Sequence, residues 1–152
     1  MDTASHLYFD DVEVGQMWES PRRTITEADV VQFAGISGDF NPLHMDHEYA
    51  ARSHFRRPIA HGLLVLSVSS GLIAYAPPMR TIALLGIKDW QFHKPVFFGD
   101  TIQVRTQIVG KEVRSRGRRG VITWHRQIVN QNGIVVQEGQ SLTLVQGRAA
   151  KN

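Results

Sequence analysis

The feature that most constrains the fold is an apolar run from Gly62 to Ala76, which Pro77 and Pro78 close. A helix that crosses a bilayer needs about 20 apolar residues. This run is shorter, and it contains a cluster of three serines: Ser67, Ser69 and Ser70. A helix that is apolar on most sides but too short to cross a membrane packs inside a domain. The run therefore predicts a central, buried helix.

The rest of the chain after this helix has the pattern of strands. Thr101–Ile108 alternates polar and apolar residues with period two, as a half-buried strand does. Asn132-Gly133 is a strong signal for a hairpin turn. The other expected strands are Thr81–Phe92, Val121–Val129 and Ile134–Val145. Short connections between successive strands imply an antiparallel sheet.

One long helix and one antiparallel sheet define an α+β layer arrangement, in which the sheet wraps around the helix. A length of 152 residues fits a single domain spanning residues 1–152. The chain contains no internal repeat or linker that would divide it. Before the central helix we expect an early strand and two further helices.

The first of those helices should begin after Thr26, because Thr26 and Asp29 form a variant of the capping box. Val30, Phe33, Ala34 and Ser37 then share one face that should be buried. Gly38 can end the helix in the left-handed conformation. Asp46 can cap a short second helix.

Between the two helices lies the segment that carries the chemistry. Asp39 and His44 are separated by Asn41 and Pro42, and Pro42 disfavours helical geometry at the residue before it. We therefore expect both side chains on an irregular loop or at its edges. A carboxylate and an imidazole placed in this way can exchange protons near neutral pH, and Asn41 could orient the carboxylate or a water.

Three other interpretations of this segment have to be weighed. Asp and Asn beside Pro are common in turns, where they satisfy local backbone groups. A calcium loop is a poor fit, because its sixth position would be His44 where glycine is needed and its twelfth Ala50 where glutamate is needed. His44, Asp46 and His47 have metal-ligand spacing, but the sequence offers no further evident ligand.

The segment Phe33–His44, with the sequence FAGISGDFNPLH, resembles the hydratase motif of MaoC-like dehydratases, which include the (R)-specific enoyl-CoA hydratases. Three weaker resemblances follow the family's order along the chain: Phe9–Gly15, Ala60–Leu64 and Phe92–Thr101. The resemblance implies the hot-dog fold, an antiparallel sheet curled around one long helix. It also implies a hydro-lyase that adds water to a 2-enoyl-CoA to give an (R)-3-hydroxyacyl-CoA, or runs the reverse reaction.

The resemblance carries residue roles as well. Asp39 and His44 match the catalytic pair, and Gly62 matches the glycine whose backbone N–H binds the thioester oxygen. Such a donor at a helix N-terminus stabilises the charge that develops on that oxygen. Ser70 matches a serine of the central helix that supports the site. His61 could shape the mouth of the pocket.

Composition narrows the possible partners. The chain has no cysteine, which excludes disulfides and thiolate chemistry and fits a reducing compartment such as the cytoplasm. The N-terminal residues 1–6 do not resemble a signal peptide, and residues 149–152 form no targeting signal. We expect no metal and no cofactor beyond the coenzyme A of the substrate.

The net charge of +3 favours anionic ligands in general. A basic cluster surrounds Gly117, and it could be a solvated loop, a contact for coenzyme A phosphates through Arg114 and Arg116, or a nucleic-acid contact. The cluster has no interleaved aromatic residues, so we expect no nucleic-acid binding.

Two other functions compete with hydration. Hot-dog proteins include acyl-CoA thioesterases, in which water attacks the carbonyl carbon in place of the β-carbon. Paired hot-dog subunits can also share work unequally, so the chain could be a non-catalytic subunit that binds acyl thioesters. By resemblance we expect a homodimer, with a hexamer built as a trimer of dimers as a further possibility.

Overall fold

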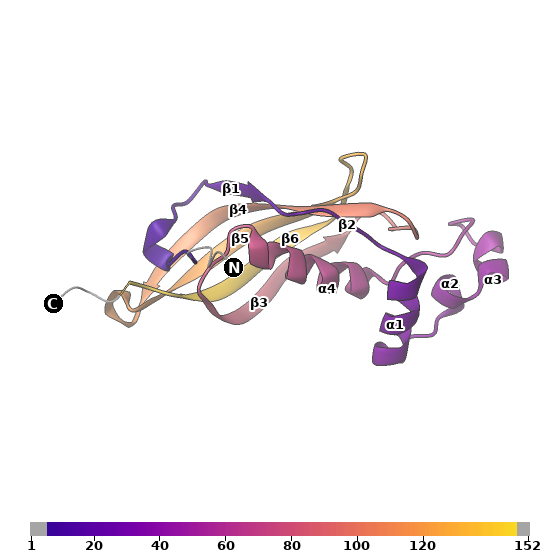
Figure 1. The fold of residues 1–152 in the computed structure, drawn as a ribbon, viewed down its shortest axis with the longest axis horizontal. Coiled ribbons are helices and arrows are strands. Elements are labelled where there is room, and N and C mark those ends of the chain that lie inside the picture. The colour runs from indigo at the N-terminus through magenta and orange to yellow at the C-terminus, as the bar shows by residue number, and fades with distance from the viewer. Residues whose placement is uncertain (1–5, 149–152) are drawn as a thin grey trace, which may run out of the picture.

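A computed structural model describes residues 6–148. The expectations about targeting signals concern residues 1–6 and 149–152, and all of these except His6 lie outside the described residues. The described residues form a six-stranded antiparallel sheet with the path β1-β4-β5-β6-β3, and β2 also pairs with β4 (Figure 1). The strands are β1 (Met17–Glu19), β2 (Arg23–Thr24), β3 (Thr81–Phe92), β4 (Thr101–Arg114), β5 (Arg119–Val129) and β6 (Val135–Gln146).

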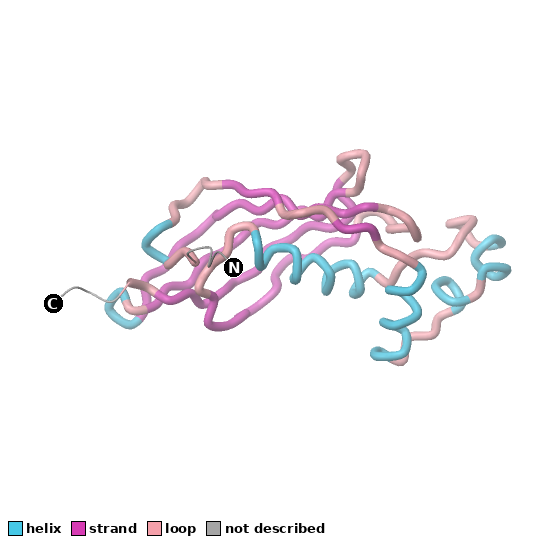
Figure 2. Tube along the Cα trace, in the orientation of Figure 1, coloured by secondary structure: helices cyan, strands magenta, loops and turns pink. Residues whose placement is uncertain are grey.

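The α-helices lie along one face of the sheet and beyond one of its ends (Figure 2). The α-helices are α1 (Glu27–Ser37), α2 (Pro42–Met45), α3 (His47–Arg52) and α4 (Gly62–Leu72). Short 3₁₀ turns are η1 (Phe9–Asp11), η2 (Ile73–Tyr75) and η3 (Ser115–Gly117). No helix among the described residues is long and apolar enough to cross a membrane.

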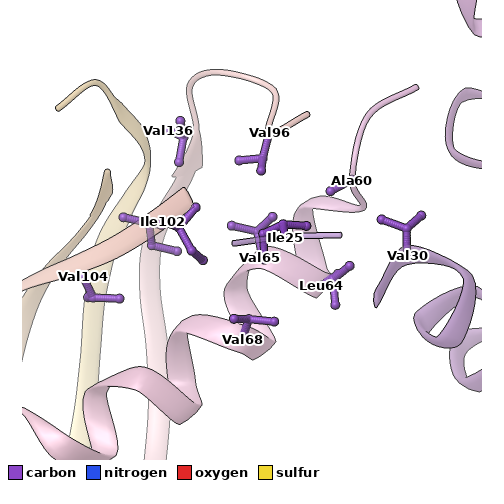
Figure 3. Packing of buried hydrophobic residues seen from close by; sticks show 11 residues of the cluster. Ile25, Val30, Ala60, Leu64, Val65, Val68, Val96, Ile102, Val104 and Val136 are labelled. Atoms are coloured by element: carbon purple, nitrogen blue, oxygen red, sulfur yellow. The ribbon is translucent and has the colours of Figure 1, made fainter. Parts of the chain in front are cut away.

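Helix α4 packs on the sheet through one face. Its Val65 and Val68 meet Ile102 and Val104 of β4 in the main core (Figure 3). Ile128 of β5 belongs to the same core. Burying one such aliphatic side chain stabilises the fold by about 1.5–3 kcal/mol. This core confirms the expectation of an antiparallel sheet packed on one long helix.

The extent of burial of α4 was predicted wrongly. The α-helix ends at Leu72 and continues only as a 3₁₀ turn, and Leu63 is 60% exposed while Ser67 and Ser70 also face solvent. A single sheet covers only one side of a helix, so the apolar residues on the other side stay uncovered in one chain. Because α4 is apolar on all sides, we infer that another surface covers the side of α4 that faces away from the sheet.

The predicted strands are confirmed, with longer ends. Strand β4 continues to Arg114, and β5 begins at Arg119. Most of the basic cluster therefore belongs to the β4–β5 hairpin, whose strands extend beyond the core. Strand β3 ends the sheet path and pairs only with β6 among the described residues. Its apolar side chains are largely uncovered: Ile82, Leu84, Leu85 and Ile87 are each about half exposed or more.

Candidate active site

The site lies beyond one end of the sheet, where α1, α2 and α3 gather around the start of α4 (Figure 1). Helix α1 begins as predicted: the Thr26 side chain accepts the Asp29 N–H, and Asp29 accepts the Thr26 N–H. It ends at Gly38, whose φ of 78° lies in the left-handed region that glycine adopts at little cost. This turn carries the chain out to Asp39.

The buried face of α1 is smaller than the spacing predicts. Val30 and Ala34 are buried and Phe33 is partly buried, but Ser37 is exposed. The Ser37 hydroxyl donates to the Phe33 carbonyl and accepts the Asp39 N–H at 3.2 Å. Ser37 therefore helps to shape the turn into Asp39 and does not belong to the core.

His44 lies on a helical turn and not on an irregular loop. Pro42 is the first residue of α2, where its missing N–H costs nothing, and Asn41 caps the helix by accepting the Leu43 N–H at 2.9 Å. Pro42 thus keeps Asn41 out of the helical conformation and is itself the first residue of α2. The Asn41 N–H donates to Asp39 Oδ1 at 3.2 Å, so Asn41 orients both Asp39 and the turn that carries His44.

The His44 imidazole has a defined tautomer. Its Nδ1 lies 2.7 Å from the carbonyl oxygen of Ile59, and a carbonyl can only accept, so Nδ1 carries the proton. Nε2 then keeps a free lone pair. Burial lowers the pKa of His44 from its ordinary value, and nearby His61 lowers it further, against the opposing effects of the Ile59 hydrogen bond and Asp39. The ring is therefore held neutral and able to accept a proton.

His61 contacts both Asp39 and His44. It does not shape a pocket mouth, which corrects the expectation for this residue. Its side chain is buried, and its Nε2 donates to the backbone carbonyl of Asp39 at 2.9 Å. Its ring contacts those of Phe33 and His44, with centroids 5.0 and 3.9 Å away. His61 is thus a positioning residue that fixes the Asp39 backbone and one face of the His44 ring.

Gly62 is the residue to which the resemblance assigns the oxyanion donor. It is the first residue of α4, and among residues 6–148 no acceptor is found for its N–H. Its carbonyl accepts Gln137 Nε2 at 2.9 Å, and Gln137 Oε1 in turn accepts Trp90 Nε1 at 3.0 Å. These bonds anchor the helix start to the sheet while the N–H remains available.

A cavity of about 380 Å³ opens beside Gly62. Its lining combines residues of the loop before α4, of α4 itself, of the end of β3 and of the loop after β3, including Ile59, Val65, Phe92 and Lys94. A side chain at position 62 would place its first carbon 2.9 Å from the Phe92 ring, so glycine keeps this end of the cavity open. A mostly apolar cavity that Gly62 lines at the start of a helix has the character that an acyl chain requires.

Metal binding is a poorer use of the same residues. Ligand atoms of Asp39, His44 and His61 lie within 4.8 Å of one another, and His61 takes the place of the His47 that the sequence spacing indicates. His61 Nε2, however, already donates to a carbonyl, and its Nδ1 is buried without a hydrogen-bond partner. His47 points away and pairs with Glu27 at 2.7 Å. The donor set favours proton transfer over a tetrahedral metal site.

Three of the predicted residues lie away from this site. Ser70 is eight residues beyond Gly62, donates to the Ser67 carbonyl, and lines a different cavity. Arg114 pairs with Glu112, and Arg116 lies in η3. The hairpin that carries both arginines is at the opposite end of the molecule from α1–α3 (Figure 1), so only another subunit could bring them to Asp39.

Solved structures identify the class of fold. A Mycobacterium tuberculosis protein described as having a double hotdog fold is 24% identical and matches with a TM-score of 0.85, covering 97% of this chain and 46% of that one. The (R)-hydratase of Aeromonas caviae is 33% identical with a TM-score of 0.74, covering 87% and 96% of the two chains. The fold is therefore the α+β hot-dog fold that the sequence predicts.

Within that class, the chain belongs to the MaoC-like domain family, whose model matches residues 11–129. It is 34% identical to the (R)-specific enoyl-CoA hydratase of Aeromonas caviae over 131 residues, 86% of this chain and 93% of that protein. It is 42% identical to the protein MaoC of Klebsiella aerogenes over 107 residues, which is 70% of this chain but only 32% of that longer protein. The curated relatives named as hydratases and dehydratases are hydro-lyases, and this chain is a member of their family.

Proposed function

We propose that this protein hydrates a 2-enoyl-CoA to an (R)-3-hydroxyacyl-CoA, or catalyses the reverse dehydration. The observation that carries the proposal is the convergence of the Asp39 carboxylate and the His44 imidazole to within 4.8 Å of each other and of His61, the residue directly before the helix-start N–H of Gly62. Relatives named as (R)-specific enoyl-CoA hydratases support the same substrate and stereochemistry.

Over one turnover, Asp39 and His44 take one proton from water and deliver one proton to the substrate. A water held between Asp39 and Nε2 of His44 gives one proton to the pair, and its oxygen forms a bond to C3 as the π bond between C2 and C3 breaks and leaves a single bond. Negative charge moves to the thioester oxygen, where the Gly62 N–H stabilises it. The pair then delivers a proton to C2 and returns to its starting state. No cofactor other than the coenzyme A of the substrate takes part.

The direct test mixes the purified protein with crotonyl-CoA and follows the loss of the enoyl absorbance. We expect the absorbance to fall and 3-hydroxybutyryl-CoA to accumulate with the R configuration. Release of free coenzyme A thiol would favour a thioesterase instead. Tight binding of acyl-CoA without turnover, over several chain lengths and branched chains, would favour a non-catalytic subunit.

The pH profile follows from the environment of His44. The reaction needs a neutral imidazole, and burial lowers the pKa of His44 below its ordinary value of 6.5. The working form is therefore present at pH 7 and is lost only as the pH falls through the lowered pKa. We expect kcat/KM for crotonyl-CoA to fall on an acid limb whose midpoint lies below 6.5. A limb centred above that value would contradict this role for His44.

The coenzyme A phosphates are proposed to lie against Lys94 and Arg57 and not against Arg114 and Arg116 of the same chain. Lys94 lines both the Gly62 cavity and a neighbouring one of about 390 Å³, which Arg57 also lines. The Arg57 guanidinium stacks on the Phe97 ring at 3.8 Å, which holds its charge at the rim. Two cations beside the cavity suit a phosphorylated carrier.

We further propose that two copies join as a homodimer through β3, in a reducing compartment such as the cytoplasm. A long, apolar, unpaired edge strand is an aggregation hazard unless something covers it. Pairing of β3 with its symmetry mate would extend the sheet and bring a second surface toward the exposed side of α4. A hexamer would need further contacts between such dimers.

Light scattering tests this assembly with one charge placed on the strand. Leu85 is 53% exposed in the single chain, so Leu85→Lys should leave the monomer folded but place a charge in the subunit contact. We expect the wild type to elute as a dimer at micromolar concentration and this variant to shift toward monomer. Val113→Lys, at a 63% exposed position of β4, is the matched control and should stay dimeric. A dimer that both variants preserve would place the contact elsewhere.

A further inference from the structure

Arg126 is a buried cation without an acidic partner. It lies on β5 between Trp124 and Ile128, on the face of the sheet that meets α4, and is only 7% exposed. Its Nε donates to the Ser141 hydroxyl at 2.7 Å and its Nη1 to the Thr106 hydroxyl at 2.9 Å. Among residues 6–148 no carboxylate lies within ion-pair distance of the guanidinium, and Nη2 has no acceptor.

Burial of Arg126 without an acidic partner lowers the stability of the protein when no ligand is bound. Removing a charge from water is strongly unfavourable unless an opposite charge and hydrogen bonds replace the water. Burial lowers the pKa of Arg126 to about 10, so the side chain still carries its charge at neutral pH. Neutral hydroxyls and the Trp124 ring, whose centroid is 4.9 Å from Cζ, compensate only in part. A methionine or leucine would fill the same space without the cost.

The guanidinium borders a cavity of about 340 Å³ that contains no acidic side chain. The cavity lies between the C-terminal half of α4, represented by Ser70, and the start of β3, represented by Thr81 and Leu84. The Gly62 cavity lies between the same two elements at their other ends, where Gly62 faces Phe92. The two cavities share no lining residue and lie toward opposite ends of α4 and β3, so a chain that reached from one to the other would run along these two elements.

The distance between Gly62 and Arg126 can be estimated in two ways, along the sheet and along α4. Gln137, which bonds Gly62, pairs with Ile128, and Arg126 is two strand positions further on, or about 7 Å. Ser70 is eight helical residues from Gly62, or about 12 Å. An extended carbon chain advances about 1.25 Å per bond for ordinary bond lengths and angles. A chain of roughly six to ten carbons would therefore span the distance.

We propose that Arg126 and the cavity beside Ser70 form a subsite for an anionic group, specifically a carboxylate at the far end of the substrate's acyl chain. This inference rests on the proposed function, because it assumes that the thioester lies at Gly62. It names the substrate class as ω-carboxylated acyl-CoA of about six to ten carbons. The carboxylate would accept from Nη2 and from the hydroxyl of Thr143, which lines the cavity, accepts Trp124 Nε1 and keeps its own hydrogen to donate.

Calorimetry with saturated acyl-CoA tests the subsite without any need for turnover. The pairs are adipoyl- against hexanoyl-CoA, suberoyl- against octanoyl-CoA, and sebacoyl- against decanoyl-CoA. We expect the carboxylated member of at least one pair to bind about 10- to 100-fold more tightly, the range for hydrogen bonds to a charged group. Equal dissociation constants within all three pairs would overturn the inference.

Variants at Arg126 assign the preference to this side chain. Arg126→Gln keeps a donor for the Ser141 hydroxyl but removes the charge, and it should abolish the preference. Arg126→Lys should restore part of it. The matched control is Arg105→Gln, because Arg105 is an exposed cation of the neighbouring strand that pairs with Glu19. The ratio within each pair does not depend on the folded fraction of a variant, so partial unfolding does not imitate the expected result.

The outcomes separate the subsite from the proposed reaction. Hydration of neutral enoyl-CoA without any carboxylate preference leaves the reaction standing and removes the subsite. A carboxylate preference without hydration removes the reaction and keeps the subsite. An Arg126→Gln variant that retains the preference but becomes monomeric would assign the guanidinium to the subunit contact and would overturn the inference.

Discussion

Asp39→Asn is expected to lower kcat/KM for crotonyl-CoA by about 10²- to 10⁴-fold, the contribution that a positioned acid or base makes to a proton transfer. The amide keeps the shape of the carboxylate but cannot take a proton from water. The Asp39 side chain is 52% exposed and accepts only the Asn41 N–H, which an amide oxygen can also accept. The free energy of unfolding should therefore change by less than about 0.5 kcal/mol.

The matched control for this substitution is Asp46→Asn. Asp46 lies seven residues further along and caps α3 by accepting the Tyr49 N–H, a role that asparagine fills equally well. The Asp46→Asn substitution also removes one negative charge near the site. It therefore separates the loss of a proton acceptor from a general change in the electrostatic potential of the site. Comparable losses in both variants, or wild-type rates in Asp39→Asn, would remove Asp39 from its role.

Local sequence signals determine much of this architecture. The Thr26–Asp29 capping box, the Gly38 turn and the Asp46 cap each act within four residues, so the sequence alone locates the ends of α1 and the start of α3. The period-two pattern of Thr101–Ile108 likewise marks the core of β4. The motif around Asp39 and His44 is also local, because its residues lie within one short segment, and the sequence alone therefore predicts both as candidates.

Long-range contacts could not be predicted in the same way. His61 lies 22 residues from Asp39, and nothing near it in sequence shows that its ring packs against His44. The hairpin of Arg114 and Arg116 lies at the far end of the sheet because of the lengths of β4 and β5, which the alternation pattern defines only in their cores. Solvent exposure of α4 and β3 could not be predicted either, since an apolar side chain that awaits a second subunit has the same sequence signal as one in the core.

Arg126 carries a sequence signal of its own, although no recognisable motif surrounds it. It occupies an inward position of an alternating strand, two residues from both Trp124 and Ile128, where an apolar side chain is expected. A charged residue at a core position breaks the local pattern, and such breaks tend to occur at functional sites. A single inward cation is harder to recognise than a contiguous loop motif, because its meaning depends on knowing which face of the strand is buried.

His44→Asn is expected to reduce kcat/KM about 10²- to 10⁴-fold while preserving the fold. The asparagine amide can still donate toward the Ile59 carbonyl, as Nδ1 does now at 2.7 Å, but nothing replaces the lone pair of Nε2. His44→Ala should lose the same activity and also some stability, about 1–3 kcal/mol, because the partly buried Ile59 carbonyl would lose a donor. Thermal unfolding and the enoyl absorbance assay measure the two effects separately.

His47→Asn is the control, since His47 lies on the next helix with a side chain that is 60% exposed and pairs with Glu27. Its replacement should leave both the rate and the unfolding midpoint close to wild type. The acid limb of the pH profile gives a further check: it should persist in His47→Asn and vanish from the residual activity of His44→Asn. A limb that survives the loss of His44 must belong to another group, and the proton acceptor would then be Asp39 without its imidazole partner.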